Sequence, residues 1–316
     1  MKKDQSSINM KAIVCKKYGG PGVLQLVNMP RPVPGDKEIL IRVHASTVSA
    51  AAIHIRNGFF PGSALITLLL RLQFGIRGPV HPVLGAEFSG VVQAVGKDVQ
   101  LYKAGDEVYG TTTGLKQGAY ADYLCVPEKW QQGLITIKPQ TLSFEMAAAL
   151  PVGGITALQL LLKGGVGAGK TVLVYGASGS VGTYAVQIAR YYGAHVTAVC
   201  SAANRQLVMS IGADVFLDYT AGAIEACKQK FDIVMDAVAK VPASRLKPLL
   251  NKQGVFVSVR AITREKMSYL QLLHQMIEEE KLLPVIDRVY PFDQLVAAHT
   301  YVDQGHKKGN VVIKHI

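Results

Sequence analysis

The sequence has few cysteines and no paired metal-ligand motif, and this shortage excludes two classes of small scaffold. The four cysteines among 316 residues are scattered, and no C-x-x-C or H-x-x-x-H pattern occurs; they are Cys15, Cys125, Cys200 and Cys227. A disulfide framework or a zinc cage is therefore not expected, and a reducing cytoplasm fits this usage. The first ten residues are polar and lack the apolar core of a secretory signal.

Long apolar runs are also missing. The most apolar stretch, 64–72, contains Thr67 and Arg71 and is far shorter than the roughly 20 residues that a membrane-spanning helix needs. We expect a buried or cleft-lining helix there, with contact to a membrane surface as the alternative. Stable insertion into a membrane is not expected.

Acidic residues are outnumbered, 22 against 34 basic ones, which gives a net charge of +12. Such a chain attracts anions. The basic residues are spread along the chain, so a solvated surface is the simplest interpretation, and it is compatible with steering of an anionic cofactor. No nucleic-acid motif accompanies the charge, and specific nucleic-acid binding is not predicted.

The chain divides into two styles of sequence. Residues 11–128 contain β-branched and aromatic runs broken by Gly, Pro or Asp, which are typical of short strands: Val23–Val27, Ile39–Val43, Phe88–Val95 and Glu107–Tyr109. From about 139, Ser143 begins an Ala-rich helix, and apolar strands then alternate with helices, which include predicted helices over Ile224–Lys230 and about Arg264–Glu280. Strands without in/out alternation indicate a parallel sheet covered on both faces.

The predicted fold is therefore α/β, with a β-rich domain and a doubly wound domain. The predicted strands of the second domain include Thr171–Tyr175, Val196–Cys200, Val215–Leu217, Asp232–Asp236 and Val255–Val259. The tail, with a helix over Phe292–Val302 and a strand over Gly309–Lys314, returns to the first style. We predict one domain from 1–138 and 285–316, and another from 139–284.

Two glycine motifs compete for a phosphate. Residues 164–171, GGVGAGKT, match the P-loop pattern, but here a helix precedes the motif and a strand follows it, which reverses the order that a P-loop requires. Residues 177–182, ASGSVG, follow strand Thr171–Tyr175 and open a helix, as the dinucleotide fingerprint does. Gly179 would let the backbone approach a diphosphate, and Gly182 would let helix and strand pack closely. Ala177 replaces the first glycine of the fingerprint, which requires that the turn keep a negative φ there.

The end of the next strand predicts NADPH as the cofactor. Enzymes that use NAD usually place an acid there, and this chain has Ser201, with Arg205 one helical turn further on. A hydroxyl and a guanidinium suit a 2′-phosphate. Tyr219, after the third strand, is a further candidate for the same pocket. The alternatives are an exposed helix arginine for Arg205 and surface packing for Tyr219.

No metal site is predicted, because the histidines of the first domain, His44, His54 and His81, have no cysteine near them in the sequence. Without zinc as a Lewis acid, an acceptor that delocalises charge is the easier substrate. Quinones, enones and other conjugated carbonyl compounds do so, and N–H and O–H donors of the protein can stabilise the remaining charge.

Motifs along nearly the whole chain resemble the zinc-free quinone oxidoreductase branch of the medium-chain dehydrogenase/reductases. Their order and spacing carry the resemblance; they are YGGP at 18–21, HPVLGAEFSG at 81–90, AGDEV at 104–108, GAYA at 118–121, AALP at 148–151, GITA at 154–157, LDY at 217–219, PVIDR at 284–288 and GHKKG at 305–309. The resemblance implies a GroES-like catalytic domain, a Rossmann domain and a homodimer. It implies that Thr156 contacts the nicotinamide carboxamide, that Ser178, Gly179, Ser180 and Val181 contact the diphosphate, and that Ser201, Arg205 and Tyr219 contact the 2′-phosphate.

The chain departs from these relatives at several positions. Zinc-bearing members have Gly-His-Glu where this chain has Gly85-Ala86-Glu87, so that ligand is lost. Ser49 and Ala52 stand where relatives often have Asn and Asp, the Gly-rich loop after Val255–Val259 is missing, and Gly309-Asn310 replaces a Gly-Lys. These changes leave the choice of substrate and the level of activity open.

The predicted mechanism is direct hydride transfer from NADPH to a small hydrophobic conjugated carbonyl compound. Solvent or the Ser49 hydroxyl would protonate the product, with a helix cap as the alternative role for Ser49. Apolar Phe59, Phe60 and Leu65–Leu70 are expected either to line the acceptor pocket or to pack in the core. The rival functions are a reductase of alkenal or enone double bonds, and an NADPH-binding sensor or crystallin-like protein with little turnover.

Overall fold

The computed structural model describes residues 8–59, 64–112, 117–130 and 133–316. The chain forms two compact units. Unit 1 comprises residues up to Ala149 together with Arg288–Lys307 and Val311–Ile316, and unit 2 comprises Leu150–Asp287 and Lys308–Asn310. In this division the helix that Ser143 begins belongs to unit 1.

Unit 1 is built mainly from antiparallel strands. Strands β1 and β2 form a hairpin, and a second sheet has the order β13-β14-β3-β4-β5-β7, with β6 paired to β3. The bounds are β1 Asn9–Cys15, β2 Leu24–Pro30, β3 Glu38–Thr47, β4 Glu87–Val95, β5 Glu107–Thr111, β6 Tyr123–Pro127, β7 Leu134–Ile137, β13 Ile286–Pro291 and β14 Asn310–Lys314. Its helices are α1 Ala50–Asn57, α2 Ala64–Phe74, α3 Phe144–Ala149 and α10 Leu295–Asp303.

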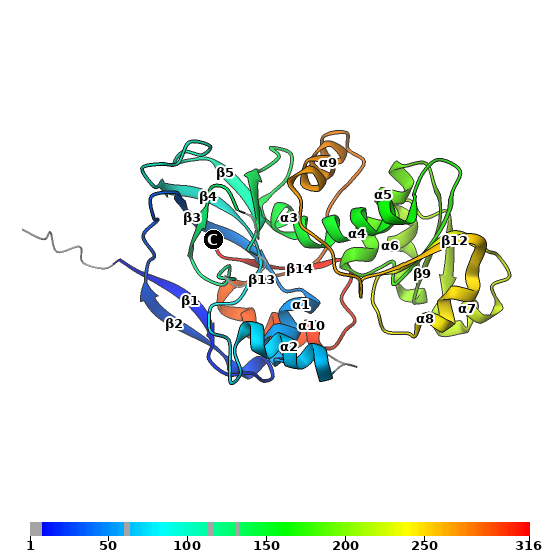
Figure 1. Cartoon of the computed structure of the whole chain (residues 1–316), viewed down its shortest axis with the longest axis horizontal. Coiled ribbons are helices and arrows are strands. Elements are labelled where there is room, and N and C mark those ends of the chain that lie inside the picture. The colour runs from blue at the N-terminus through cyan, green and yellow to red at the C-terminus, as the bar shows by residue number, and fades with distance from the viewer. Residues whose placement is uncertain (1–7, 60–63, 113–116, 131–132) are drawn as a thin grey trace, which may run out of the picture. The chain divides into compact units, whose positions relative to one another are not determined.

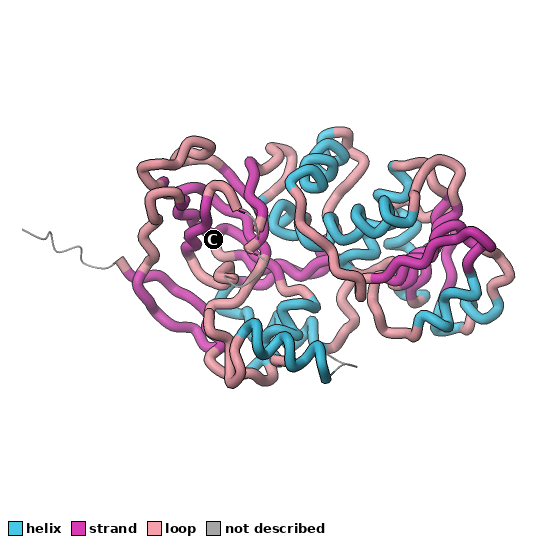
Figure 2. Tube along the Cα trace, in the orientation of Figure 1, coloured by secondary structure: helices cyan, strands magenta, loops and turns pink. Residues whose placement is uncertain are grey.

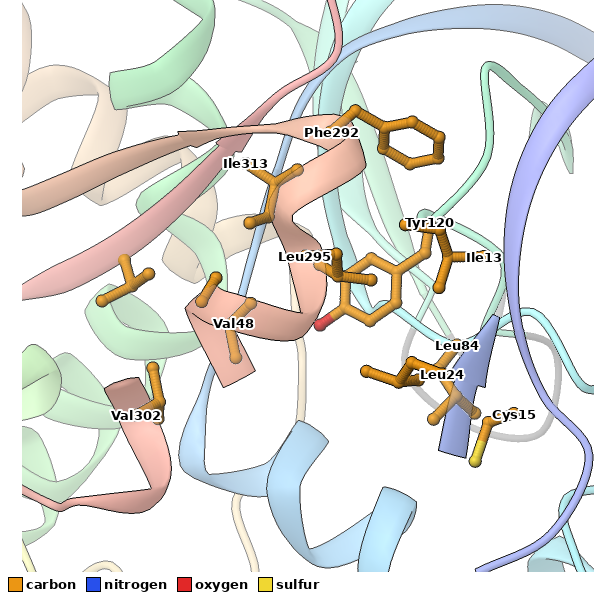
Figure 3. Close-up of a cluster of buried hydrophobic side chains, with 12 residues drawn as sticks. Ile13, Cys15, Leu24, Val48, Leu84, Tyr120, Phe292, Leu295, Val302 and Ile313 are labelled. Carbon is orange, nitrogen blue, oxygen red and sulfur yellow. The ribbon is translucent and has the colours of Figure 1, made fainter. Parts of the chain in front are cut away.

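The tail of the chain returns to the N-terminal strands. Strand β14 pairs antiparallel with β3, so that Val312 lies opposite Thr47. Helix α10 contributes Leu295 and Val302 to a core that also contains Ile13 and Tyr120 (Figure 3). Residues nearly 300 positions apart therefore share one apolar cluster, and unit 1 depends on both ends of the chain.

Unit 2 is a parallel sheet with helices. The strand order is β10-β9-β8-β11-β12, and every neighbouring pair is parallel. The strands are β8 Thr171–Tyr175, β9 His195–Cys200, β10 Val215–Asp218, β11 Phe231–Asp236 and β12 Leu250–Ser258 (Figure 2). The helices are α4 Pro151–Gly164, α5 Ser180–Tyr191, α6 Arg205–Ser210, α7 Ala223–Ala226, α8 Ala243–Leu246 and α9 Met267–Glu278 (Figure 1).

Chain order reverses between β8 and β11, which is where doubly wound sheets bind their ligands. Alternate residues of β8 point to opposite faces, and Leu173 and Tyr175 pack against Ile224 of α7 and Leu246 of α8. Helices α4 and α5 contact each other and the sheet, α4 at β11 and β12 and α5 at β8 and β9. The predicted α/β class, with a parallel sheet in the second half of the chain, is confirmed.

Three predicted helices differ from the observed ones. The helix expected over Ile224–Lys230 ends at Ala226, because Cys227 is extended. The helix expected from Arg264 starts at Met267, because both backbone groups of Arg264 bond to the side chain of Gln159. Residues 64–72 lie in a helix as predicted, but burial of this helix is wrong, since no residue of α2 is buried; its cleft-lining alternative stays a prediction.

Within the described residues, no helix has both the length and the apolar character needed to cross a bilayer.

Candidate functional site

The turn between β8 and α5 has the geometry of a dinucleotide fingerprint. Gly176 adopts φ +81°, so the left-handed residue of the turn precedes Ala177, which keeps a negative φ as the sequence required. Helix α5 then begins at Ser180, with Gly179 as its N-cap at φ −81°, and no side chain caps it. The N–H groups of Ser180, Val181 and Gly182 are therefore without an intrahelical acceptor and lie at the positive end of the helix dipole.

Glycine occupies the two motif positions, 179 and 182, for different structural reasons. A methyl group at Gly182 would lie 2.1 Å from the Gly176 carbonyl oxygen, so the protein's own packing requires this glycine. A methyl group at Gly179 would meet nothing closer than 3.5 Å. The fold does not itself require glycine at 179, which is the position where a bound diphosphate would approach the backbone.

Residues 164–171, the P-loop look-alike, connect α4 to β8 as predicted. Gly165 and Gly169 both adopt positive φ. The Thr171 N–H donates to Asp232 Oδ2 at 2.9 Å, so this N–H is paired within the protein and faces no ligand. The segment is a connection with no phosphate-binding geometry.

A polar cluster that the sequence did not reveal adjoins the turn. Asn204 Nδ2 donates to Ser178 Oγ at 3.0 Å and to Ser201 Oγ at 3.4 Å, which brings two predicted cofactor residues together. Asn204 Oδ1 is buried and has no hydrogen-bond partner among the described residues. A buried acceptor of this kind is costly unless something donates to it, and a ribose hydroxyl has the required chemistry.

The chain's tail holds the turn from the other side. The Gly309 N–H donates to the Ser178 carbonyl at 2.8 Å, and the Ser180 hydroxyl donates to Asn310 Oδ1. Asn310 Nδ2 in turn donates to the Val285 carbonyl at 3.0 Å. The Ser180 hydroxyl is thus occupied within the protein, and the parallel bridge between Gly179 and Gly309 pairs the Ser180 N–H with the tail as well.

The three residues predicted to read the 2′-phosphate lie at the carboxyl ends of β9 and β10. Ser201 follows β9, and Arg205 is the first residue of α6 with its guanidinium 5.8 Å from the Phe216 ring. No carboxylate pairs with Arg205 in the part of the chain that the structure describes. Tyr219 is 43% exposed, and its ring centroid is 6.1 Å from that of Tyr175.

A carboxylate that the sequence analysis overlooked lies beside these residues. Asp218 Oδ1 accepts from the Thr220 N–H at 2.9 Å and from its hydroxyl at 2.7 Å. These bonds, with a further one from the Ala202 N–H, lower the pKa of Asp218. The group is therefore charged at neutral pH, and its bonds to backbone N–H groups neutralise part of the negative field near the pocket.

A tight turn follows β11, on one side of the position where the strand order reverses. Asp236 Oδ1 accepts from the Ala239 N–H at 2.8 Å, and Ser258 donates to Asp236 Oδ2 at 3.1 Å. Ala239 adopts φ +55°, an unfavourable conformation for a residue with a side chain. Val238 packs over Gly176, where a methyl group would lie 2.5 Å from Val238 Cγ1. This turn therefore lies directly against the phosphate turn.

Thr156 lies on α4, next to the start of α5. A methyl group at Gly153 would be 2.9 Å from Ser180 Oγ, so α4 approaches the phosphate turn closely at that point. Thr156 is three residues further on and therefore shares this face of α4. It is half-buried. Its predicted contact with the nicotinamide carboxamide remains a prediction.

In unit 1, Ser49 is the N-cap of α1. Its Oγ accepts from the Ala52 N–H at 3.2 Å, which is the alternative role that the sequence left open. The hydroxyl proton itself has no acceptor in the described part of the chain, so a proton-donor role also stays open. Phe59 is 52% exposed, and Phe60 lies outside the described residues.

The donor set for a metal is poor. Among the described residues no group of three or more His, Cys, Asp or Glu side chains could hold a metal ion. Burial raises the pKa of the Cys15 and Cys200 thiols to about 11, so neither is a thiolate at neutral pH. Ala86 precedes β4 at the position where the zinc-bearing relatives have histidine.

Comparison with known proteins places these features in a family. Residues 35–138 match the alcohol dehydrogenase GroES-like domain, and 180–286 and 260–313 match zinc-binding dehydrogenase models. The mouse protein "NAD(P)H oxidoreductase RTN4IP1, mitochondrial" is 31% identical over 96% of this chain and 89% of its own length. The Arabidopsis thaliana protein "NADPH-dependent alkenal/one oxidoreductase, chloroplastic" is 32% identical over 96% and 79%. The structure of the quinone oxidoreductase from Coxiella burnetii matches with a TM-score of 0.82 and 27% identity, covering 98% of this chain and all of that one.

Proposed function

The chain belongs to the medium-chain dehydrogenase/reductase superfamily, among its quinone oxidoreductases and alkenal reductases, and from this premise we propose that it reduces conjugated carbonyl compounds with NADPH and without zinc. The observation that carries the proposal is the start of α5. The N–H groups of Val181 and Gly182, which have no intrahelical acceptor, an open position at Gly179 and an orphaned acceptor on Asn204 lie together there. A dinucleotide supplies a partner for each of these groups.

In this proposal, residues of unit 2 hold and orient the cofactor. The turn at 178–181 binds the diphosphate, chiefly through the Val181 N–H, and Ser201 and Arg205 bind the 2′-phosphate. Thr156, on the face of α4 nearest the turn, donates to or accepts from the carboxamide. NADPH, when bound, supplies a hydride from its nicotinamide ring.

The protein's part in the reaction is positioning and the handling of one proton. We infer that Val238, which lies against Gly176 of the phosphate turn, limits where the nicotinamide lies and so favours a fixed approach to the acceptor. The Ser49 hydroxyl keeps its proton free while its oxygen caps α1, and it or solvent protonates the reduced product. An acceptor that spreads negative charge over several atoms needs no metal, which suits a chain with Ala86 in place of a histidine ligand.

Two further properties belong to this proposal. We infer a homodimer from the family and a cytoplasmic location from the cysteine usage. The mouse and Arabidopsis relatives are named as mitochondrial and chloroplastic proteins, so sequence similarity does not favour the cytoplasm over an organelle.

Steady-state oxidation of NADPH tests the function. The purified protein is assayed with 9,10-phenanthrenequinone and with a series of 2-alkenals, each with and without EDTA. We expect turnover with at least one class of acceptor and no effect of the chelator. A preference for the alkenals selects the double-bond reductase, which the similarity to the alkenal/one oxidoreductase favours. Loss of activity with EDTA refutes zinc independence. Tight NADPH binding without oxidation of any acceptor refutes the proposal that the protein is an enzyme.

A further inference from the structure

Helix α2, labelled in Figure 1, carries a row of exposed leucines. Leu65, Leu68, Leu69 and Leu72 follow the spacing i, i+3, i+4, i+7 and therefore form one stripe. Their exposed fractions are 66%, 54%, 55% and 61%. In an ordinary surface helix the stripe at this spacing faces the core, whereas in α2 it is exposed.

The side of α2 opposite the stripe is the less exposed one. Thr67, Leu70 and Phe74 lie there, at i, i+3 and i+7, and each is half-buried. Polar contacts fix the end of the helix: Arg71 Nε donates to the Gly58 carbonyl at 3.0 Å, and the guanidinium lies 5.5 Å from the Tyr18 ring. The helix is thus held without burying its leucines, and the outer stripe is left for another surface.

The surroundings of the stripe are positively charged. None of the chain's 22 acidic residues lies within 39–86. Exposed Lys16, Lys17 and Arg77 lie near the end of α2, since a methyl group at Gly78 would be 2.3 Å from the Lys16 carbonyl oxygen. None of the three forms an ion pair with a carboxylate in the described part of the chain.

An exposed apolar stripe bordered by unpaired cations is typical of helices that lie in the interface of an anionic bilayer. With 11 residues, α2 is too short to cross the membrane and long enough to lie along its surface. A second copy of the chain is a poorer occupant, because pairing the two stripes brings the same cations together. We propose that α2 docks this protein onto the surface of a membrane that contains anionic phospholipid.

Flotation of the full-length protein with large unilamellar vesicles tests this docking. One set of vesicles contains phosphatidylcholine with about one third phosphatidylserine, and the other contains phosphatidylcholine alone, each at low and high salt. The first variant is Leu65→Gln, Leu69→Gln, Leu72→Gln, because Gln keeps the helix propensity of Leu and removes the apolar stripe. Its matched control carries three Leu→Gln changes at leucines that are equally exposed elsewhere, Leu26, Leu101 and Leu283. A second variant, Lys16→Gln, Lys17→Gln, Arg77→Gln, removes charge alone.

We expect the wild type to bind the phosphatidylserine vesicles, and the stripe variant to bind them at least tenfold more weakly. The control should remain within twofold of wild type, and the charge variant and high salt should each weaken binding severalfold. Circular dichroism and thermal unfolding verify that the variants fold, and an unchanged NADPH affinity verifies that unit 2 is intact. Equal vesicle binding by stripe variant and wild type overturns the proposal, as does no binding by the wild type. A dimer that the stripe variant converts to monomer, or a raised KM for acceptors with unchanged vesicle binding, would assign α2 to a second copy or to the acceptor site instead.

Discussion

Replacing Arg205 with alanine should remove the preference for NADPH that we propose, so that NADPH and NADH bind alike. The guanidinium is exposed, has no carboxylate partner among the described residues, and is held over the Phe216 ring at 5.8 Å. Binding a phosphate therefore costs this guanidinium little free energy, because no existing ion pair must break and the Phe216 ring already orients it.

The size of the effect follows from the type of bond. A charge-assisted hydrogen bond contributes about 1.5–3 kcal/mol to binding. Because Arg205 is exposed, screening by water and salt reduces this to the lower end, about 1.5–2 kcal/mol. At 1.4 kcal/mol for each factor of ten, the Kd for NADPH should rise roughly 10- to 30-fold. The Kd for NADH, which has no 2′-phosphate, should change by less than about twofold on the same reasoning.

Titration of each variant with NADPH and NADH, followed by the fluorescence of the reduced nicotinamide, measures both constants. Lys252→Ala is the control, because it removes the same charge from the amino end of β12, away from the carboxyl ends where the crevice lies. The control should leave both constants unchanged. The preference for NADPH should also shrink at high salt in the wild type and hardly at all in Arg205→Ala. Equal weakening of NADPH and NADH by Arg205→Ala would refute the assignment of this residue to the 2′-phosphate.

Three further outcomes follow from the structure. Gly182→Ala places a methyl group 2.1 Å from a carbonyl oxygen and should lower the free energy of unfolding by more than about 3 kcal/mol in urea titration, whereas Gly179→Ala should cost less than about 1 kcal/mol and weaken NADPH binding at least tenfold. Comparable losses of stability in the two variants would contradict the roles given to these glycines. Burial and the neighbouring Arg56 lower the pKa of His299 to about 3, so the unfolded state binds the extra proton below pH 6.5; the stabilising effect of a neutral His299 is complete above that pH and is lost as pH falls towards 3. Between pH 7.5 and 5.5 the wild type should lose about 1 kcal/mol of stability that His299→Gln does not lose, and parallel pH profiles of the two proteins would be inconsistent with a buried neutral imidazole. Burial raises the pKa of the Cys200 thiol to about 11, so mass spectrometry after iodoacetamide treatment at pH 8 should find it unmodified until the protein unfolds, and rapid alkylation of the native protein would show the thiol to be accessible.

The sequence by itself determined the features that depend on local pattern. Thr171–Tyr175 was predicted with both of its ends, because a buried parallel strand reads as a short apolar run between breakers. The order of strand, glycine turn and helix selected 177–182 over the P-loop look-alike. The negative φ required at Ala177 was also correct, since Gly176 provides the left-handed residue instead. Such features repeat or terminate within a few residues, so neighbours in the sequence determine them.

Tertiary structure decided which distant groups meet. Asn310 hydrogen-bonds with Ser180 across 130 positions of sequence, and Asn204 joins Ser178 to Ser201; nothing in the local pattern distinguishes these two asparagines from turn residues. The sequence also did not predict that the leucine stripe of α2 is exposed, because an apolar helix has the same sequence pattern whether its stripe contacts the core or the solvent. Which of the two happens depends on the surface that the rest of the chain offers to it, and here that surface contacts the opposite side of the helix.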